Sequence, residues 1–248
     1  DDLLTGRSGA NPLGYLEKTV LHRPNVGNDL VLTIDDKTQR VAAEAMAGRE
    51  GALVALDPRS GEVLALVSLP GFDPNGLVVD VQNEDRLAAA AAVEEYWNSL
   101  RDNPENPLFN RATEGLYPPG STFKTITAAA ALAEDMAKED DQYTCKPEII
   151  VNGFRLKNWR EDEQTYNLAG AYAWSCNTIF AQLGLDLGPK RLDDWASRFH
   201  FGRRIPFELP VSTSTLATTS GFLGDPVALA STAFGQGQVQ TTPLHMAL

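Results

Sequence analysis

Apolar and polar residues recur with regular periods in the first third of the chain and predict a strand, a helix and a hairpin. Residues 30–34 have the composition of a β-strand. Asp35 or Asp36 can then cap an amphipathic helix over residues 37–46. Two apolar runs flank a turn of Asp, Pro and Gly within residues 52–68, which predicts a hairpin with both strands largely buried.

The rest of the chain is predicted to be mainly helical. Residues 85–99 are Ala-rich with interspersed charges, as in a surface helix. From Ser121 the sequence is apolar on nearly every side after the first turn, which predicts a helix buried through the centre of a domain. Two further helices are expected over residues 168–185 and 191–199, with a Ser- and Thr-rich loop over residues 206–224.

The length of the chain favours one main domain. A chain of 248 residues can bury a substantial core, and two equal domains are less compatible with that length. Residues 1–28 are rich in Gly, Asn and Pro without a sustained period, so we interpret them as a connector or the tail of a preceding domain. The main domain is then 29–248. The chain lacks an initial Met and ends like the start of an apolar helix, so we expect both ends to be truncated.

Composition and charge exclude several classes of function. The hydrophobic share of 43% and the charged share of 22% are those of an ordinary globular protein. The formal net charge of -12 argues against nucleic acid as a partner, because nucleic acid is bound by clustered Lys and Arg. No apolar run has the length of a membrane span, and no signal-peptide pattern is present. Two cysteines are too few for a disulfide framework, and three scattered histidines lack zinc-ligand spacing.

Ser121 and Lys124 are the main catalytic candidates. At this spacing on a helix the two side chains share one face, about 5–6 Å apart. A serine hydroxyl is a weak nucleophile at neutral pH, and a lysine in a low-dielectric site loses its proton easily, so Lys124 can be the general base. A Ser-x-x-Lys match is more often a solvated helix turn. Here the helix is too apolar for a surface helix, and a buried lysine requires a reason.

Ser175, Cys176 and Asn177 form the only Ser-x-Asn triplet of the chain, near the start or middle of the predicted helix 168–185. A polar pair inside a helix would otherwise lower the stability of the helix without an evident reason, although a local helix cap is the simpler interpretation. The Cys176 side chain would point away from the face that its neighbours share. We therefore expect it to be a buried structural thiol and not a nucleophile.

These two motifs resemble those of serine acyltransferases that include penicillin-binding proteins and class A β-lactamases. The surrounding sequence resembles class B penicillin-binding proteins over nearly the whole chain. The segments that carry this resemblance are Asn110-Arg111-Ala112, the run from Gly115 to Gly120, Asp57-Pro58, Phe72-Asp73-Pro74-Asn75, and Gly235-Gln236-Gly237 before Thr242-Pro243. The implied fold is α+β, or α/β in the loose sense: a β-lactamase/transpeptidase-like antiparallel sheet flanked by helices, with a central helix that starts at the nucleophile.

The resemblance implies a peptidoglycan D,D-transpeptidase. Ser121 would attack a D-Ala-D-Ala stem peptide, release the terminal D-Ala and pass the acyl group to an amine of a neighbouring peptide. β-Lactams would acylate the same serine. Lys124 would accept the Ser121 proton, Ser175 would relay a proton to the leaving amine, and Asn177 would hold a substrate amide. The Ser121 N–H would supply half of an oxyanion hole.

The resemblance also implies a substrate-binding set and shows one departure. The implied substrate-binding residues are Gly120, Asn177, Gly235, Gln236 and Gly237. The third motif of the family, Lys-Thr-Gly or Lys-Ser-Gly on a strand, should follow Gly237 and is absent, so domain 29–248 would be truncated before that strand. Arg59-Ser60-Gly61 precedes Ser121, and its turn context explains it. We expect an incomplete cleft in this chain.

Partners and location follow from the resemblance alone. The implied partners are peptidoglycan stem peptides, β-lactams and a glycosyltransferase of the wall-synthesis machinery, in cell-shape or cell-division processes. No metal or organic cofactor is implied. The parent protein would act on the extracytoplasmic face of the bacterial membrane, anchored by an N-terminal segment outside this chain.

Two other functions remain alternatives. A D,D-carboxypeptidase or β-lactamase-type hydrolase would be deacylated by water, and a β-lactamase needs a further base, for which no Glu-x-x-x-Asn signal follows Pro206. A non-catalytic module that binds wall peptides or partner proteins would be free to lose Ser121 or Lys124, and both are present. A Ser-His-Asp hydrolase is disfavoured because no Gly-x-Ser-x-Gly occurs.

Overall fold

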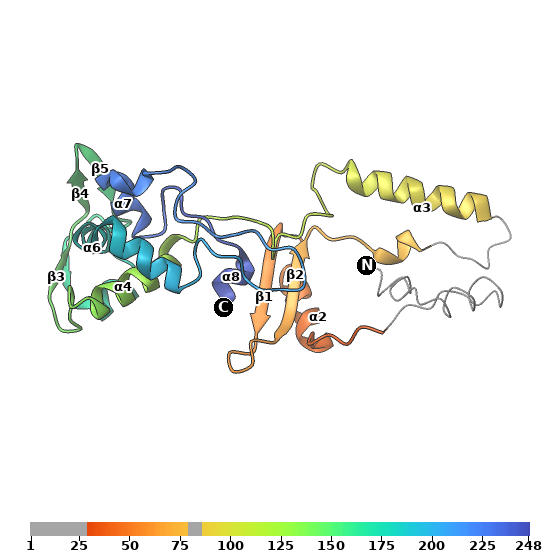
Figure 1. The fold of residues 1–248 in the computed structure, drawn as a ribbon, viewed down its shortest axis with the longest axis horizontal. Coiled ribbons are helices and arrows are strands. Elements are labelled where there is room, and N and C mark those ends of the chain that lie inside the picture. Colours follow the sequence, from red (N-terminus) through yellow and green to blue (C-terminus); the bar gives the residue numbers. More distant parts are fainter. Residues whose placement is uncertain (1–28, 79–85) are drawn as a thin grey trace, which may run out of the picture.

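The computed structural model describes residues 29–78 and 86–248, so the connector predicted over residues 1–28 lies outside the described residues. The described part is elongated, with a helical body at one end, a hairpin in the middle and helix α3 at the other end (Figure 1). The helices and strands are α2 Asp36–Ala45, β1 Gly51–Leu56, β2 Val63–Leu69, α3 Arg86–Arg101, α4 Lys124–Ala133, β3 Tyr143–Cys145, β4 Glu148–Val151, β5 Phe154–Lys157, β6 Gln164–Tyr166, α5 Leu168–Ala173, α6 Asn177–Arg198, α7 Pro226–Thr232 and α8 Pro243–Ala247. Within the described ranges no helix has both the length and the apolarity needed to cross a membrane.

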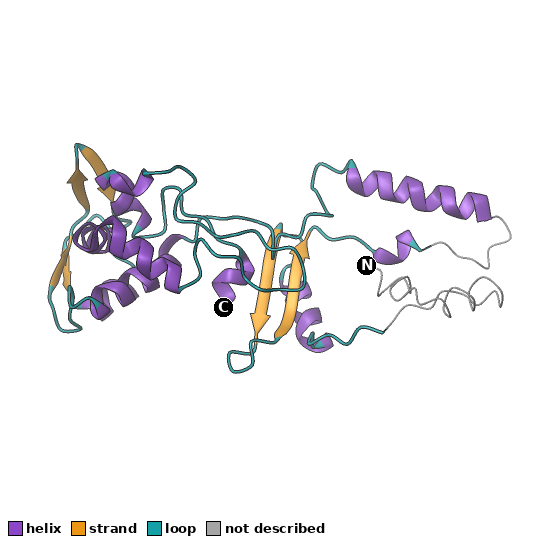
Figure 2. Cartoon of the chain, viewed as in Figure 1, coloured by secondary structure: helices purple, strands orange, loops and turns teal. Residues whose placement is uncertain are grey.

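Strands β1 and β2 pair antiparallel and confirm the predicted hairpin (Figure 2). Helix α2 packs on β2, where Ala42 joins Ala65 and Val67 in a small apolar cluster. The helix begins at its predicted cap, because the Asp35 carboxylate accepts a hydrogen bond from Thr38 N at 2.8 Å. Helix α8 contacts the other strand, β1, so helices flank both strands.

Two expectations for this region are wrong. Residues 30–34 belong to none of the sheets in the described part, and the side chains of Leu30, Val31 and Leu32 are exposed, so these three pack against no core. The segment reaches β2 at its end, where Asp35 N donates to Leu64 O at 3.0 Å. The hairpin is also less buried than expected, because all of β1 is half-buried and β2 has only two buried residues.

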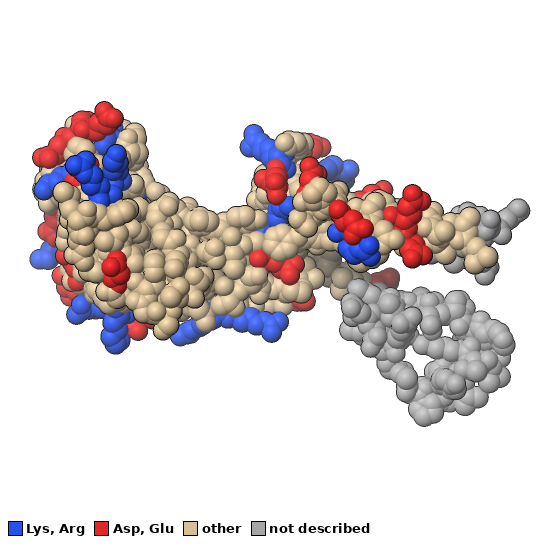
Figure 3. All heavy atoms as spheres, turned by 90° about the horizontal axis from the view of Figure 1, so that it is seen from above, with Lys and Arg blue, Asp and Glu red and all other residues tan. Residues whose placement is uncertain are grey.

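A buried arginine ties the hairpin to the segment that leads to Ser121. The Arg111 guanidinium donates to Glu50 Oε1 at 2.8 Å and to the main-chain oxygens of Glu105 and Asn106 at 2.6 and 3.1 Å. Its side chain is only 6% exposed, so these partners satisfy donors that have little access to water. Elsewhere acidic and basic side chains are interspersed on the face drawn in Figure 3.

Helices α4, α6 and α7 pack together and form the main core. Phe123, Phe180 and Leu187 are among its largest fully buried side chains. The helix that follows Ser121 is buried on one side only, since Leu132 is 39% exposed. The expectation of burial on nearly every side is therefore wrong, because a single apolar side chain such as Leu132 can face water at little cost.

The predicted helix 168–185 is two helices. Helix α5 ends at Ala173 and α6 begins at Asn177, with Ser175 between them at φ 54°. The predicted helix 191–199 is the second half of α6, which continues through a kink at Gly188, φ 76°. The break at Ser175 was missed because the apolar period runs across it and the residue there is not the usual glycine. The predicted start near residue 191 agrees with the non-helical Gly188, which divides α6 into two parts.

Strands β3 to β6 are absent from the sequence-based expectation. Strand β3 pairs with β6 and β4 with β5, both antiparallel, so the described part holds three separate two-stranded sheets. Strands of three or four residues are too short to show a period in the sequence. The helices and antiparallel sheets together confirm the predicted α+β class.

Cys145 and Cys176 form a disulfide, so the expected free thiol at Cys176 is wrong. The bond joins the end of β3 to the residue before α6, and both cysteines are buried. Two cysteines are too few for a framework but enough for one bridge, and only the fold brings them together. A bridge across 31 residues stabilises a fold by about 2–4 kcal/mol through its effect on the unfolded chain.

The contact between α6 and α7 generates the first prediction. A Cβ at Gly184 would lie 2.2 Å from the Ala233 Cβ. Replacing glycine by alanine in a helix normally stabilises it by about 1 kcal/mol. We predict that Gly184→Ala instead lowers the free energy of unfolding by about 1–3 kcal/mol, because the helices must separate. Urea unfolding would measure this. Gly224→Ala is the control, since its added methyl group meets nothing within 4 Å, and equal effects of the two changes would contradict the prediction.

Candidate active site

Ser121 and Lys124 lie at the entry to α4. The chain turns at Gly120, φ 57°, into a short 3₁₀ helix over Gly120–Phe123, and α4 begins at Lys124. Glycine adopts this left-handed conformation without strain. Ser121 is exposed, whereas Lys124 is 1% exposed, and Lys124 Nζ donates to Ser121 Oγ at 3.1 Å. The structure therefore brings the predicted pair into contact.

Ser175 comes to the same place through an uncommon backbone conformation. Its φ of 54° is left-handed, and Cys176 N donates to Ala171 O at 3.0 Å, the bond that closes a helix through a left-handed residue. Glycine is usual at that position, because a Cβ there costs about 1–2 kcal/mol. The serine hydroxyl donates to Ser121 Oγ at 2.7 Å, a contact that glycine could not make.

The Lys124 amine is held by oxygens from the second motif. Nζ lies 2.7 Å from Ser175 O, 2.8 Å from Ser175 Oγ and 2.8 Å from Asn177 Oδ1. The first and third are carbonyl-type oxygens that can only accept, whereas the hydroxyls can donate or accept. A neutral amine has two N–H groups for the carbonyl oxygens and one lone pair for a hydroxyl. The surroundings of Lys124 can therefore satisfy the neutral amine as well as the charged one.

Burial favours the neutral form of Lys124. Desolvation lowers the pKa of Lys124 to about 8, because the charged form loses its hydration. Within the part of the chain that the structure describes, the salt bridges include none from this amine. At pH 7 about a tenth of the molecules would then carry a neutral amine next to the Ser121 hydroxyl. This population is sufficient for a general base.

Asn177 is positioned by the segment after β5. Asn177 N donates to Asn158 Oδ1 at 3.2 Å, and its side-chain Nδ2 donates to Lys157 O at 3.3 Å. These bonds orient the amide so that Oδ1 faces Lys124. Asn158 was not among the residues predicted from the sequence, and no motif in the sequence signals it.

The turn Gly235-Gln236-Gly237 lies beside the nucleophile, as predicted. Gly120 N donates to Gly235 O at 3.0 Å, so the turn contacts the residue before Ser121. A Cβ at Gly235 would lie 1.8 Å from Gly120 O, which leaves room for glycine only. Gln236 lines the pocket that holds Ser121, whereas Gly237 packs toward Phe222.

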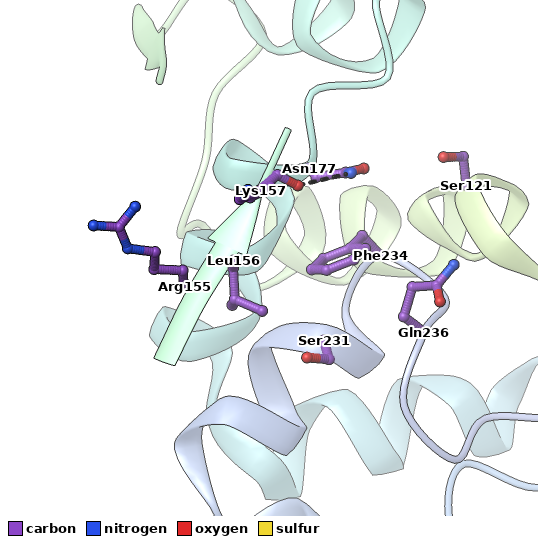
Figure 4. A pocket seen from close by; sticks show the side chains of 8 residues that line it. All are labelled: Ser121, Arg155, Leu156, Lys157, Asn177, Ser231, Phe234 and Gln236. Carbon is purple, nitrogen blue, oxygen red and sulfur yellow. Dashed lines mark hydrogen bonds between the residues drawn. The ribbon is translucent and has the colours of Figure 1, made fainter. Parts of the chain in front are cut away.

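An open pocket of about 470 Å³ connects these residues (Figure 4). Ser121 and Gln236 lie at one side and strand β5 at the other. The pocket is lined by Ser121, Arg155, Leu156, Lys157, Asn177, Ser231, Phe234 and Gln236. The lining residues of β5 and α7 were missed because neither element was predicted. Arg59-Ser60-Gly61 lies in the β1–β2 turn and lines no part of this pocket.

The geometry supports serine-based acyl transfer. An exposed hydroxyl contacts a buried amine, a second hydroxyl bridges the two, and an open pocket leads to the first hydroxyl. In the described ranges no group of three or more His, Cys, Asp or Glu side chains could hold a metal ion.

Residues 51–248 match the family described as penicillin binding protein transpeptidase domain. The chain is 34% identical over 241 residues to the peptidoglycan D,D-transpeptidase MrdA of Acinetobacter baumannii, covering 91% of the chain and 33% of MrdA. It is 40% identical over 229 residues to the peptidoglycan D,D-transpeptidase PbpA of Mycobacterium tuberculosis, covering 88% of the chain and 44% of PbpA. The chain thus spans less than half the length of these relatives.

Solved structures with a similar fold include acyl-enzymes. Penicillin-binding protein A from M. tuberculosis, as an imipenem acyl-enzyme complex, superimposes with a TM-score of 0.83 at 37% identity, covering 99% of this chain and 56% of that chain. Pseudomonas aeruginosa PBP2, in complex with WCK 5153, gives a TM-score of 0.76 at 31% identity, covering 90% and 50%.

The Lys124 environment generates the second prediction. With ¹³C-labelled lysine, we expect one Cε signal to titrate with a pKa of about 8. NMR over pH 6 to 11 measures this, and Lys124→Arg assigns the signal by removing it. If no Lys124-dependent signal titrated near pH 8, the amine would be charged at neutral pH and could not act as the base described here.

Proposed function

The chain belongs to the penicillin-binding protein transpeptidase family, and on that premise we propose that it carries the site of a peptidoglycan D,D-transpeptidase of class B. Its relatives MrdA and PbpA are named peptidoglycan D,D-transpeptidases. Because the chain spans less than half of their length, the activity of the whole protein is part of this proposal. The reaction cross-links stem peptides through an acyl-enzyme on Ser121, and β-lactams inhibit it by acylating the same serine.

One observation carries the proposal: the Lys124 amine contacts both hydroxyls, and the hydroxyls contact each other. The Nζ to Oγ distances are 3.1 Å for Ser121 and 2.8 Å for Ser175, and the two Oγ atoms are 2.7 Å apart. A proton can therefore move from Ser121 to Lys124 and back through Ser175 without a large movement of any side chain. General acid-base catalysis by groups within this reach contributes about 10²- to 10⁴-fold to a rate.

Acylation begins at Ser121. Its Oγ forms a bond to the carbonyl carbon of the penultimate D-Ala while its proton passes to the neutral Lys124 amine. The carbonyl oxygen becomes an oxyanion near the start of the 3₁₀ helix, where main-chain N–H groups have no partner within the helix. The C–N bond then breaks, and the leaving amine takes a proton from Lys124 through Ser175. The products are the acyl-enzyme and free D-Ala.

Deacylation reverses the same path. An amine of a neighbouring stem peptide attacks the ester carbon, loses its proton through Ser175 to Lys124, and forms the new peptide bond. Ser121 Oγ leaves with the proton from Lys124, so the site returns to its starting state. We assign Asn177 to the orientation of Lys124 and of a substrate amide, because its Oδ1 contacts the lysine and its side chain lines the pocket.

The substrate-binding set is Gly120, Asn177, Gly235, Gln236 and Gly237. The bond between Gly120 and Gly235 and the place of Gln236 in the pocket support these three residues as determinants of the cleft floor, and Asn177 lines the same pocket. Gly237 supports the turn through its φ of 78° and acts indirectly. The domain limits 29–248, with residues 1–28 as a connector or the tail of a preceding domain, are part of the same proposal.

Partners and location extend the proposal to the whole protein. We propose action on the extracytoplasmic side of the bacterial membrane, together with a glycosyltransferase of the wall-synthesis machinery, in cell shape or division. The buried disulfide supports an oxidising location, because such bonds are rare in reducing compartments.

Acylation is the third prediction. Incubation with benzylpenicillin is expected to add the mass of one penicilloyl group to the 248-residue chain or to a longer natural form of it. Intact-protein mass spectrometry measures the adduct, and Ser121→Ala, which removes only the attacking oxygen, should carry none.

Transfer of the acyl group to an amine distinguishes a transpeptidase from a hydrolase. A D-Ala-D-Ala stem peptide with an added amine acceptor should give the cross-linked peptide and free D-Ala, whereas a carboxypeptidase gives the shortened acid. Absence of any adduct on a folded protein, in both forms, would contradict the acyl-enzyme and favour a module that only binds wall peptides.

A further inference from the structure

We propose that the Cys145–Cys176 disulfide is a positioning device that holds Ser175 and Asn177 against Lys124. The inference rests on the proposed function, because it assigns the bond a role in the acylation of Ser121. Neither cysteine touches the reacting atoms, so the role is indirect. It concerns the conformation of the three-residue segment that carries the second motif.

The segment needs a restraint of this kind. Ser175 has a left-handed φ of 54°, a conformation that non-glycine residues rarely adopt. Such a residue persists only when its surroundings fix it. If Ser175 returned to an ordinary conformation, its carbonyl oxygen and hydroxyl would both leave Lys124. Two of the four oxygens around the amine come from this one residue.

The disulfide acts on the residue between the two functional side chains. Cys176 is fully buried, precedes α6 as its N-cap, and is bonded to the last residue of β3. N-cap residues commonly fix a helix start by a side-chain hydrogen bond, but Cys176 makes none to its helix backbone. The disulfide therefore fixes the start of α6, where a capping hydrogen bond would otherwise do so. It fixes the point from which Ser175 and Asn177 diverge.

Asn158 completes a closed ring with the disulfide. Its Nδ2 donates to Cys145 Sγ at 3.1 Å, and its Oδ1 accepts from Asn177 N at 3.2 Å. The ring runs from Cys145 through the disulfide to Cys176, along the chain to Asn177, and through Asn158 back to Cys145. Ser175 is fixed from its other side as well, because Trp159 Nε1 donates to Trp174 O at 3.0 Å.

A purely stabilising disulfide would have different consequences. The main core is extensive and includes α4, α6 and α7, so loss of one bond leaves most of the packing intact. The remaining effect is local: the segment samples ordinary conformations, and Lys124 becomes accessible to water, which favours its charged form. A misplacement of about 1 Å at a reacting group can slow a reaction by about 100-fold.

The test is Cys145→Ser, which breaks the bond and leaves residues 175–177 unchanged. The serine oxygen can still accept the hydrogen bond from Asn158. We expect acylation by a fluorescent penicillin to slow by about 10- to 100-fold. The pH midpoint of acylation should move to a higher value, since access of water to the amine would weaken the desolvation that lowers the pKa of Lys124. Amide hydrogen exchange should become faster in the peptide over residues 171–178 and stay unchanged in α2 and the hairpin.

The control for general loss of stability is Ala42→Gly, in α2 and away from the pocket. It should lower the melting temperature while acylation and its pH midpoint stay as in the wild type. The disulfide itself is checked by alkylation of the denatured wild type, which should gain no mass without a reductant.

Three results would overturn the inference: free thiols in the wild type, unchanged acylation and exchange in Cys145→Ser, or faster exchange throughout that variant. If the wild type is not acylated at all, the proposed function fails. The hydrogen-exchange pattern then decides the positioning role on its own.

Discussion

The whole site depends on one buried amine. Lys124 is 1% exposed and lies within hydrogen-bond distance of oxygens from three residues, so its donors, acceptors and charge must be satisfied within the protein. Two carbonyl-type oxygens take two N–H groups, and the hydroxyls take what remains. Burial lowers the pKa of the lysine toward neutrality. In a core without a function, such a buried lysine would only lower the stability of the protein. Here its surroundings allow it to act as a base.

The backbone is strained at Ser175, a residue that places oxygens around the Lys124 amine. Ser175 occupies a left-handed position that normally belongs to glycine, and Gly120 and Gly235 approach so closely that neither turn could move independently. Around Ser175 the restraints are unusually many: a disulfide on the next residue, Asn158 on Asn177, and the hydrogen bonds that close α5. Local strain and local restraint occur together, as is typical of functional sites. The rest of the fold supports this region by packing α4 against α6.

The features that were predicted correctly from the sequence alone depend on residues that are close together in the chain. Ser121 and Lys124 were paired correctly because helical spacing is a local property. The contact between Lys124 and Ser175, 51 residues apart, was expected only through the family resemblance, since no period in the sequence connects them. The break between α5 and α6 was missed because serine stands where glycine would have signalled it. The disulfide and the contacts of Asn158 depend on distant segments meeting, which a single sequence does not reveal, whereas β5 pairs with the neighbouring β4 and was missed because both strands are short.

The central claim is that the left-handed Ser175 exists to deliver its hydroxyl to Ser121 and Lys124. The most direct measurement is the rate of penicilloyl adduct formation in Ser175→Gly, together with its free energy of unfolding. Glycine relieves the backbone strain and removes only the hydroxymethyl group, so stability should change by no more than about 1 kcal/mol. Adduct formation should slow by about 100-fold or more. A folded Ser175→Gly protein that is acylated at the wild-type rate would contradict the account.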